Sequence, residues 1–584
     1  MKKTSLAPPF IPMSKAEMFK LGWDELDILL VTGDCYVDHP SYGISLIGRL
    51  MLDEGFRCGI IAQPDWRTPQ SLQIMGRPRL ACAISSGNMD SMVNLYTAGR
   101  RLRRDDAYSE DGAPGLRPPH ALIVYSQLAR RAFPGLPILN GGMEASLRRV
   151  AHYDYWQDKL RPGVLVDSKA ELGMYGQGER TTIEVCAKLD ANEPLRGIRG
   201  TVYLLGKKEA EIFDLTDYVE LPDWEIMQQD RDALMTETII VEREMNPYTG
   251  SGLYQRYGER ILILEPPPEP LTTEELDRVH ELPYSRQPHP QYKKRIPAFD
   301  AVSASIPAVR GCPGGCSFCG LVSHQGRAIT SRSPDSVMKD VMRLIESKNF
   351  KGTISDIGGA AGNIYGSRVK DVKICHRCRR SSCLVPKACP NYVADGLELL
   401  RLMRRVSSTP GVKHLYINSG IRLDLAVRQK ELMSEMVRKH VSGHMKVAPE
   451  HLHPEVLRLM RKNSAEDFYR FMTFFEEESR KIGKEQYLIP LFISNFPGCT
   501  DQEMKTVDDF LNRHNWSPQQ VQDYIPLPMT MGAAMYYTGK TPDGNPITVN
   551  RGLAERRPQI QVLKKKRNHT AIRKSIDKKD FRQQ

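Results

Sequence analysis

Residues 310–320 read RGCPGGCSFCG, and this stretch decides how the rest of the chain is interpreted. Its cysteines, Cys312, Cys316 and Cys319, have the spacing C-x3-C-x2-C. Three thiolates on one tight loop can each bind one iron of a 4Fe-4S cube, which leaves the fourth iron open to a substrate or cofactor. The stretch therefore predicts such a cluster. The alternative is a structural zinc held by the three cysteines and His324.

Patterns typical of strands and helices alternate on both sides of this loop. From 299 to 535, six apolar runs alternate with helical patterns, and the first run leads into the cysteine loop. This order favours a barrel or part of one. Residues 1–262 alternate similarly, which predicts βαβ units and a mostly parallel sheet, so the fold class is α/β. The predicted strands are 25–33, 57–63, 81–85, 121–126, 137–142, 164–168 and 201–206, then 304–311, 352–359, 413–420, 444–450, 487–495 and 521–528.

Composition shifts mark the domain boundaries. A chain of 584 residues is too long for one hydrophobic core. Residues 1–262 form the predicted Rossmann-like, doubly wound domain, and the proline-rich residues 263–298 form a linker. Residues 299–535 form the predicted partial (β/α)6 barrel, with a cysteine-rich insert at 362–392. Residues 536–584 form a basic tail that we expect to be disordered.

Composition also narrows the compartment and the partners. The two N-terminal lysines are not followed by an apolar core, and no apolar run approaches the roughly 18–20 residues that span a membrane. We therefore expect a cytoplasmic protein with no membrane partner. Seven of the 12 cysteines lie between 312 and 389, which indicates metal ligation rather than disulfides. Residues 551–584 hold 12 basic and 3 acidic side chains, a net charge of +9 that a solvated tail or a nucleic-acid contact explains.

The cysteine loop resembles the signature of the radical S-adenosylmethionine (SAM) superfamily. The resemblance includes the aromatic residue before the last cysteine, Phe318. It implies a full or partial (β/α) barrel in which SAM chelates the open iron through its amino and carboxylate groups. One electron from the cluster then cleaves SAM, and the resulting 5′-deoxyadenosyl radical abstracts a hydrogen atom from a substrate. A reductant such as flavodoxin or ferredoxin is the partner that this chemistry implies.

Residues at the ends of later predicted strands resemble the superfamily's SAM contacts. Gly358 and Gly359 resemble the glycine motif whose backbone meets the SAM amino group, although Ala360 stands where the family often has a polar residue. Ser419 and Arg422 resemble the segment that meets the ribose and carboxylate, and Arg422 is suited to a bidentate carboxylate pair. The alternative for Arg422 is a surface arginine at a helix start. Further candidates for contacts with SAM or substrate are Lys446, Glu450 and His451.

Nearly the whole chain resembles the YgiQ-type radical SAM proteins, a family of enzymes whose substrate is unknown. The segments that carry this likeness are 38–43, 140–149, 151–156 and 528–531. The resemblance implies an enzyme, but it supplies neither a substrate nor a catalytic residue. Cys499 follows the fifth predicted strand, where it could face the radical as a hydrogen donor or be a buried, inert thiol.

A second group of cysteines follows the second predicted strand of the barrel. The group is Cys375, Cys378, Cys383 and Cys389. Four thiolates can close a zinc site or hold an auxiliary iron–sulfur cluster, and the spacing does not separate these readings. Basic residues surround the group, which a contact with RNA phosphates or a soluble loop surface would explain. The alternative to an enzyme is thus a non-catalytic iron–sulfur or zinc protein that binds RNA through its basic tail and this insert.

A doubly wound sheet before a radical SAM barrel resembles the cobalamin-binding radical SAM enzymes. Their corrinoid motif is Asp-x-His-x-x-Gly, whereas here Asp38 and His39 are adjacent and Gly43 lies four residues further on. This spacing speaks against cobalamin. The glycines at 173, 176 and 178 do not match the dinucleotide fingerprint either. The loop after the first strand, 34–43, is the expected ligand side of the sheet, and Gly141 and Gly142 would line a nucleotide tail or form a turn.

Overall fold

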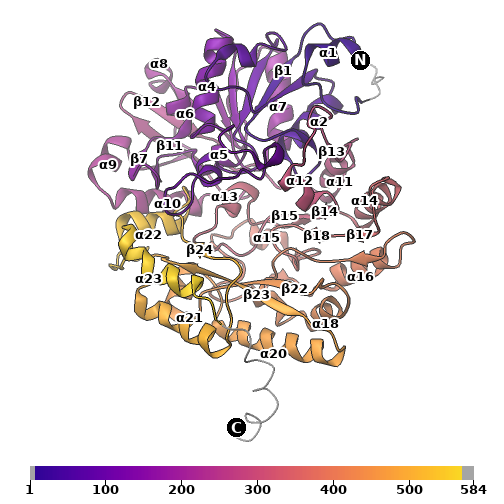
Figure 1. Cartoon of the computed structure of the whole chain (residues 1–584). Coiled ribbons are helices and arrows are strands. Elements are labelled where there is room, and N and C mark those ends of the chain that lie inside the picture. The colour runs from indigo at the N-terminus through magenta and orange to yellow at the C-terminus, as the bar shows by residue number, and fades with distance from the viewer. Residues whose placement is uncertain (1–6, 568–584) are drawn as a thin grey trace, which may run out of the picture.

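A computed structural model describes residues 7–567 of the chain. Figure 1 shows two lobes: the first half of the chain forms the lobe drawn in indigo to magenta, and the second half forms the lobe drawn in orange to yellow. The segment that carries the three cysteines lies where the lobes meet. Within residues 7–567, no helix combines the length and the apolar character that a bilayer crossing requires.

A large, mostly parallel sheet forms the first lobe. Its five strands on one side run parallel to their neighbours, whereas the other side is antiparallel except for its last pair. The strand order across the sheet is β10 (Tyr218–Glu220), β11 (Gly252–Tyr257), β12 (Arg260–Leu264), β9 (Thr201–Leu205), β8 (Leu172–Met174), β5 (Ile138–Gly141), β4 (Ala81–Ser85), β1 (Ile28–Thr32) and β3 (Cys58–Ala62).

Helices cover both faces of this sheet, because its central strands are apolar on both sides. In β1, Leu29 and Val31 belong to one core, while Ile28 and Leu30 belong to the other. Alternation of side chains along a strand separates the two faces in this way. The helices on the first face are α4 (Ala121–Ala132), α6 (Val164–Ser168) and α10 (Ala233–Arg243), and those on the second are α2 (Gly43–Asp53) and α7 (Glu179–Asp190).

Two predicted strands of this lobe are helices. Residues 121–126 begin α4, in which Leu122, Tyr125 and Ala129 are buried at a helical spacing that extends beyond the short apolar run. Residues 164–168 form α6, whose run of five residues is too short to reveal a period. The other five predicted strands of this half each contain a strand.

The second lobe contains short parallel strands around one core. β14 (Ser305–Pro307) pairs with β18 (Asp356–Gly358), and β17 (Thr353–Ile354) pairs with β21 (His414–Leu415). A bridge between Ile421 and Val447 leads to a three-stranded sheet. The strands of that sheet are β22 (His444–Glu450), β23 (Tyr487–Ser494) and β24 (Gln522–Asp523). The outer helices of the second lobe include α14 (Pro334–Glu346), α16 (Leu397–Ser407), α18 (Lys430–Lys439), α20 (Ala465–Lys481) and α21 (Asp501–Arg513).

The proline-rich stretch between the lobes is folded rather than extended throughout. It contains α11 (Thr273–Glu281), which begins with a capping box between Thr272 and Glu275. Leu276 and Val279 of α11 pack against α2 in a small core of their own. The link therefore holds the first lobe in a fixed place instead of acting as a free spacer.

The last described segment is also more ordered than its charge suggested. The predicted start of the tail falls inside α22 (Met531–Thr538), and α23 (Leu553–Lys564) follows. Arg556 of α23 is buried and forms an ion pair with Asp523 at 2.9 Å. Disorder is therefore the wrong prediction for this helix, because net charge does not show that Arg556, Gln559 and Leu563 lie on one buried face. The remainder of the predicted tail, 568–584, lies outside the described residues.

Candidate functional site

The loop with Cys312, Cys316 and Cys319 lies between β15 (Val309–Arg310) and α13 (Leu321–Gln325). Its middle residue, Ser317, fixes it through three hydrogen bonds. The Ser317 N–H donates to the Met460 carbonyl at 3.1 Å, its hydroxyl donates to the Leu459 carbonyl at 2.7 Å, and its carbonyl accepts from Gly532 N–H at 2.7 Å. The loop is thus attached to α19 (Pro454–Met460) and α22, which hold its cysteines in place.

The three thiols lie close enough to influence one another's ionisation. Burial, together with the neighbouring Cys316 and Cys312, raises the pKa of Cys319 to about 12. Burial also raises the pKa of Cys312. A thiol must lose its proton to bind iron, so a cation at this loop would displace these protons. The donor set therefore fits a 4Fe-4S cluster chemically: three thiols share one loop, and no fourth cysteine of the loop competes for the last iron.

Arg422 lies beside these thiols as the N-cap residue of α17 (Leu423–Ala426). Its Nη1 lies 4.0 Å from the Cys316 sulfur, and its Nη2 donates to the Asp424 carboxylate at 2.6 Å. Burial alone would lower the pKa of Arg422, but Asp424 and the Cys316 and Cys312 thiols raise it well above its ordinary value. The side chain is 10% exposed, which rules out the surface arginine that the sequence left open. A fixed positive charge therefore faces the thiols.

Glu450 lies near the same loop from the end of β22. It is buried, and burial raises the pKa of its carboxyl, which Lys462 and Arg422 lower in part. The Lys462 ammonium lies 3.9 Å from its carboxylate. Its φ of 65° is in the left-handed region, which a residue other than glycine rarely occupies. Backbone strain of this kind is common at active sites and ligand-binding sites, where the surrounding structure holds a side chain in position.

Gly358, Gly359 and Ser419 meet at the ends of two neighbouring strands. Asp356 organises them: its carboxylate accepts from the Asn418 N–H at 3.0 Å, from the Ser419 N–H at 3.2 Å and from the Ser419 hydroxyl. A Cβ added at Gly358 would lie 2.6 Å from the Ser419 hydroxyl oxygen. A glycine is therefore required here so that the two strand ends can approach each other.

Phe318 contributes packing rather than polarity to the loop. Its ring meets the Phe496 ring edge-to-face, with 6.4 Å between centroids, and it packs against the large core of the second lobe.

The two other candidates near β22 differ from each other. Lys446 is exposed, whereas His451 is fully buried and burial lowers its pKa to about 3. Its Nε2 lies 3.5 Å from the Cys499 sulfur.

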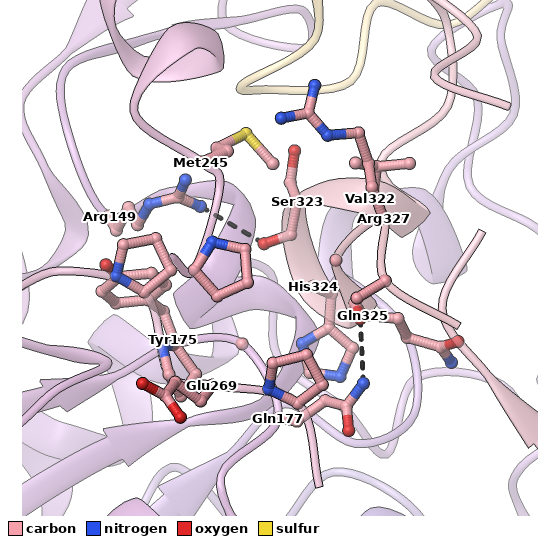
Figure 2. A pocket seen from close by; sticks show the side chains of 17 residues that line it. Arg149, Tyr175, Gln177, Met245, Glu269, Val322, Ser323, His324, Gln325 and Arg327 are labelled. Carbon is pink, nitrogen blue, oxygen red and sulfur yellow. Dashed lines mark hydrogen bonds between the residues drawn. The ribbon is translucent and has the colours of Figure 1, made fainter. Parts of the chain in front are cut away.

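His324 does not join the cysteines. Its Nδ1 lies 2.9 Å from the Ser146 hydroxyl of the first lobe, and burial lowers its pKa to about 4. Figure 2 shows the neighbouring contacts between the lobes: Arg149 donates to the Ser323 carbonyl, and Gln177 donates to the Gln325 carbonyl at 2.8 Å. α13 thus anchors the cysteine loop to the first lobe, and the Ser146 contact makes His324 part of this anchor.

The second cysteine group lies against the loop and against the first lobe. The Asn246 side chain donates to the carbonyls of Cys375 at 3.0 Å and Cys378 at 2.8 Å. The Cys383 N–H donates to the Pro313 carbonyl of the cluster loop at 2.9 Å. Burial raises the pKa of Cys383 to about 11; Arg327 lowers it, and the other three cysteines of the group raise it, so the four thiols are neighbours.

Metal binding stays a prediction for this insert and for the loop with Cys312, Cys316 and Cys319 alike. Within residues 7–567, no group of three or more His, Cys, Asp or Glu side chains is arranged to hold a metal ion as it stands. Several of the basic side chains of the insert have partners inside the protein: Arg379 pairs with Glu244 at 2.7 Å, and Arg368 lies 3.5 Å from Asp395. These pairs reduce the positive charge that the insert offers to a phosphate backbone.

A large cleft opens between the sheet of the first lobe and the first strands of the second. It encloses about 1760 Å³, including its open mouth. Its walls come from the ends of β1, β4, β5 and β8, from the starts of α2 and α7, and from strands β14, β15 and β18. Gly358 and Gly359 lie on its wall, so the cleft extends from the predicted SAM edge to the sheet.

The first-lobe residues of the corrinoid-like segment are buried in fixed contacts. Asp38 forms an ion pair with buried Arg49, and His39 Nδ1 accepts from the Ser41 N–H at 3.1 Å. Burial and the nearby Arg286 lower the pKa of His39 well below its ordinary value. Gly43 begins α2 at the wall of the cleft.

Several residues that organise the site were not predicted. Asp356 holds the Ser419 loop, Asp424 holds Arg422, and Asn363 accepts from the Arg422 N–H at 2.9 Å. Asp424 stands only two residues after Arg422, and Asp356 precedes the glycine pair by two, so both stood beside residues that the sequence did single out. Asn363 is 59 residues from its partner, and no local pattern marks it.

The comparisons with known proteins identify both halves of the chain. Residues 10–305 match the family described as Radical SAM N-terminal, and residues 306–511 match the Radical SAM superfamily. A UPF0313 protein of Rhodopseudomonas palustris is 44% identical over 97% of this chain and 86% of its own length. The UPF0313 protein YgiQ of Escherichia coli is 40% identical over 91% of this chain and 80% of its own. None of these matches supports the RNA-binding alternative.

Similar solved structures correct one expectation. The radical SAM methyltransferase TsrM of Kitasatospora setae, solved with cobalamin and a 4Fe-4S cluster bound, has a TM-score of 0.46 and 14% identity over 88% of this chain and 79% of its own. The cobalamin-dependent enzyme OxsB has a TM-score of 0.48 and 10% identity over 90% of this chain and 56% of its own. The expectation against cobalamin is therefore wrong as stated. Likenesses this weak transfer no cofactor, but the motif spacing is no reason to exclude one.

The matches also settle the nature of the protein. The YgiQ-type resemblance rests on the relatives, and the radical SAM resemblance of residues 310–320 rests on the superfamily match, whose range includes the three cysteines. An α/β fold with a large, mostly parallel sheet and a radical SAM domain agrees with both. The chain belongs to the UPF0313 family of radical SAM enzymes, whose chemistry uses SAM and an iron–sulfur cluster.

Proposed function

We propose that this enzyme cleaves SAM reductively at a 4Fe-4S cluster held by Cys312, Cys316 and Cys319. One observation carries the proposal: a single loop after β15 holds three buried or half-buried thiols beside the fixed guanidinium of Arg422. When bound, the cluster supplies the single electron that divides SAM into methionine and a 5′-deoxyadenosyl radical. That radical takes a hydrogen atom from a substrate and becomes 5′-deoxyadenosine.

The protein's own residues would position SAM on this loop. We assign the backbone at Gly358 and Gly359 to the SAM amino group, because both glycines line the cleft at the end of β18. Ser419 is assigned to the ribose hydroxyls, with Asp356 fixing its direction. Arg422 and Glu450 flank the loop with one positive and one acidic group, and Phe318 supports it from behind.

Arg422 has a more specific part in this assignment. Its Nε and Nη2 face Asp424, which leaves Nη1 turned toward Cys316. A guanidinium so placed would offset the negative charge that three thiolates bring to the loop. It would also bind the SAM carboxylate if one of its two hydrogen bonds to Asp424 is broken. We propose charge compensation as its main role.

The finer architecture follows the same proposal. The parallel strands of the second lobe would form a partial barrel of six units around the site. The six units would begin with β14, with β17 and β18 taken together, and with β21, β22, β23 and β24. The first lobe would be a Rossmann-like domain. The four thiols of the insert would hold zinc or an auxiliary cluster, with iron analysis of the protein as the measurement that separates the two.

Anaerobic reconstitution with iron and sulfide, followed by reduction and addition of SAM, tests the proposal. Without substrate, we expect 5′-deoxyadenosine to form slowly by abortive cleavage of SAM. With substrate, the molar amount of 5′-deoxyadenosine should exceed that of the enzyme. The triple variant Cys312→Ala, Cys316→Ala, Cys319→Ala should give none. Formation of 5′-deoxyadenosine by the triple variant would show that the cluster is held elsewhere, and loss of SAM binding by the intact, cluster-loaded protein would refute the assignment.

A further inference from the structure

The large cleft lies at the point where the strand order of the first sheet reverses. From β1 the chain first moves outward to β3, and then crosses to β4 on the other side of β1. Thr32 and Asp34 at the end of β1, and Ser85 and Gly87 at the end of β4, all line the cleft. In open parallel sheets, ligands bind in the crevice at such a reversal, beyond the carboxyl ends of the strands.

One wall of the cleft is the start of α7, a helix of 12 residues whose N-cap is Gly178. No side chain of the described residues caps this end, so within them the first N–H groups of the helix are free to bind a ligand. The helix dipole adds partial positive charge there, which favours a phosphate or carboxylate. The glycines at 176 and 178 leave the backbone of this wall without side chains that would keep a ligand at a distance.

Two buried polar groups of the cleft wall lack a partner among residues 7–567. Glu179 is 3% exposed: its Oε1 accepts from Arg310, and its Oε2 has no donor within this described part of the chain. His280 is 2% exposed, and its Nδ1 has no hydrogen bond to any described residue. Buried polar atoms are nearly always paired in folded proteins, so two unpaired ones in a single cleft point to a missing ligand. A free carboxylate oxygen needs a donor such as a sugar hydroxyl.

The charges and surfaces together define the ligand's chemistry. Arg310 compensates Glu179, so the carboxylate does not cancel the anion-binding end of α7. Burial and the nearby Arg332 and Arg310 lower the pKa of His280 well below its ordinary value, and the neutral ring can donate or accept. The apolar part of the wall suits a flat ring, and it includes Leu30, Ile44, Ile47, Ala83, Ile84 and Met174.

We propose that the cleft binds a phosphorylated ribonucleoside, with its phosphate at the start of α7, its ribose at Glu179 and its base among the apolar side chains. SAM does not fill this role, because it carries no phosphate. The site thus goes beyond the proposed function, although its wall reaches Gly358 and Gly359 and so borders the assigned SAM position. A free nucleotide and the phosphoribosyl tail of a corrinoid share the required chemistry.

Equilibrium dialysis of the full-length, cluster-loaded protein against ADP, NAD⁺ or hydroxocobalamin tests the proposal and separates these sources. The decisive variant is Gly178→Asp. The φ of −92° at Gly178 accepts a side chain, and the new Cβ would meet only the Thr182 hydroxyl oxygen at 3.7 Å. Aspartate at an N-cap stabilises a helix while its charge occupies the anion position, so a folded variant that does not bind is expected.

We expect at least one of the three probes to bind, and Gly178→Asp to weaken that binding tenfold or more. Glu179→Gln should weaken it about threefold to tenfold, since it keeps the shape but removes the charge. Gly206→Asp is the matched control, because Gly206 is the N-cap of α8 (Lys207–Ala210), and Gly206 does not line the cleft. Binding of ADP or NAD⁺ would identify a free nucleotide, and binding of hydroxocobalamin alone would identify the corrinoid tail.

Two outcomes would overturn the proposal: no probe binds the wild-type protein, or Gly178→Asp binds as well as the wild type does. The triple variant of Cys312, Cys316 and Cys319 separates this test from that of the proposed function. It should retain the probe, because the α7 wall is built without the cysteine loop. A protein that binds the probe but makes no 5′-deoxyadenosine would thus support the cleft and not the cluster.

Discussion

The two cysteine groups of this protein share one chemistry but are held in different ways. The cluster loop is fixed by backbone hydrogen bonds within the second lobe, through Ser317 to α19 and α22. The insert is fixed by side chains of the first lobe. Asn246 holds the carbonyls of Cys375 and Cys378, and the Tyr248 ring lies over His376 with 4.3 Å between centroids. The loop is therefore held by contacts within its own lobe, with α13 joining it to the first lobe, whereas side chains of the first lobe bind the insert directly.

The charge beside each group differs as well. Arg422, almost entirely buried, faces the loop and is held by buried Asp424. Arg379, at 45% exposure, pairs with Glu244 next to the insert and remains in contact with water. Water screens the second pair but not the first, so the loop has the stronger field. We therefore expect the chemistry that depends on charge at the loop and a supporting role for the insert.

Single cysteine substitutions give the largest expected difference. Cys316→Ala should lower 5′-deoxyadenosine formation more than 100-fold, because two thiolates hold an open cluster poorly. Cys378→Ala, the matched change in the insert, should leave the product within about tenfold of wild type while releasing any metal of the insert. Product assay and metal content per chain are measured in the same samples. Equal losses from the two variants would mean that both groups belong to one catalytic site.

The two arginines test the difference in burial. Arg422→Ala leaves Asp424 buried without its cation, and removing one partner of a buried pair costs about 3 kcal/mol of unfolding free energy. Arg379→Ala should cost less than about 1 kcal/mol, since its side chain is half exposed and Glu244 keeps Arg243 and the Ser251 N–H. Urea unfolding followed by circular dichroism measures both. A larger loss from Arg379→Ala would reverse the comparison.

A glycine substitution tests the contact between the two groups. Gly315 has a φ of 62°, and a Cβ there would lie 2.1 Å from the Ser381 carbonyl oxygen of the insert. Gly315→Ala must therefore push the insert away from the loop, at a cost of about 2 kcal/mol. Gly420→Ala is the control, because nothing lies within 4 Å of its new Cβ. Faster amide hydrogen exchange at residues 375–389 in the first variant alone is the expected signature, and equal exchange in both would show that the groups are independent.

Sequence patterns pointed to the loop because its three cysteines are close together in the chain. Cys312, Cys316 and Cys319 lie within eight residues, so their spacing carries the information. The strands of the second lobe were also found, since each of the six predicted ranges contains a strand. The failures at 121–126 and 164–168 have a local cause too: a short apolar run fits a buried strand and a buried helix equally well.

Contacts between distant segments could not be predicted in this way. Asn246 meets Cys378 across 132 residues, and the partners of His324 and Gln325 lie in the other lobe. The cleft is built from strand ends and helix starts of both lobes, so no single stretch of sequence contains it. The sequence did point to one wall, the loop that follows β1, because the rule for parallel sheets depends only on topology.

Cys499 gives the smallest expected effect and tests where the comparison ends. It follows β23 but belongs to neither group: it is 1% exposed, and its thiol donates to the Gln559 side chain at 3.4 Å. Burial raises the pKa of this thiol well above its ordinary value, so it stays protonated and inert. Cys499→Ala should change 5′-deoxyadenosine formation less than threefold and cost about 1 kcal/mol of unfolding free energy, from the lost thiol contacts. A loss of product as deep as that of Cys316→Ala, with the cluster intact by iron content, would instead place this thiol on the path of the hydrogen atom and make it a third functional kind of cysteine in the chain.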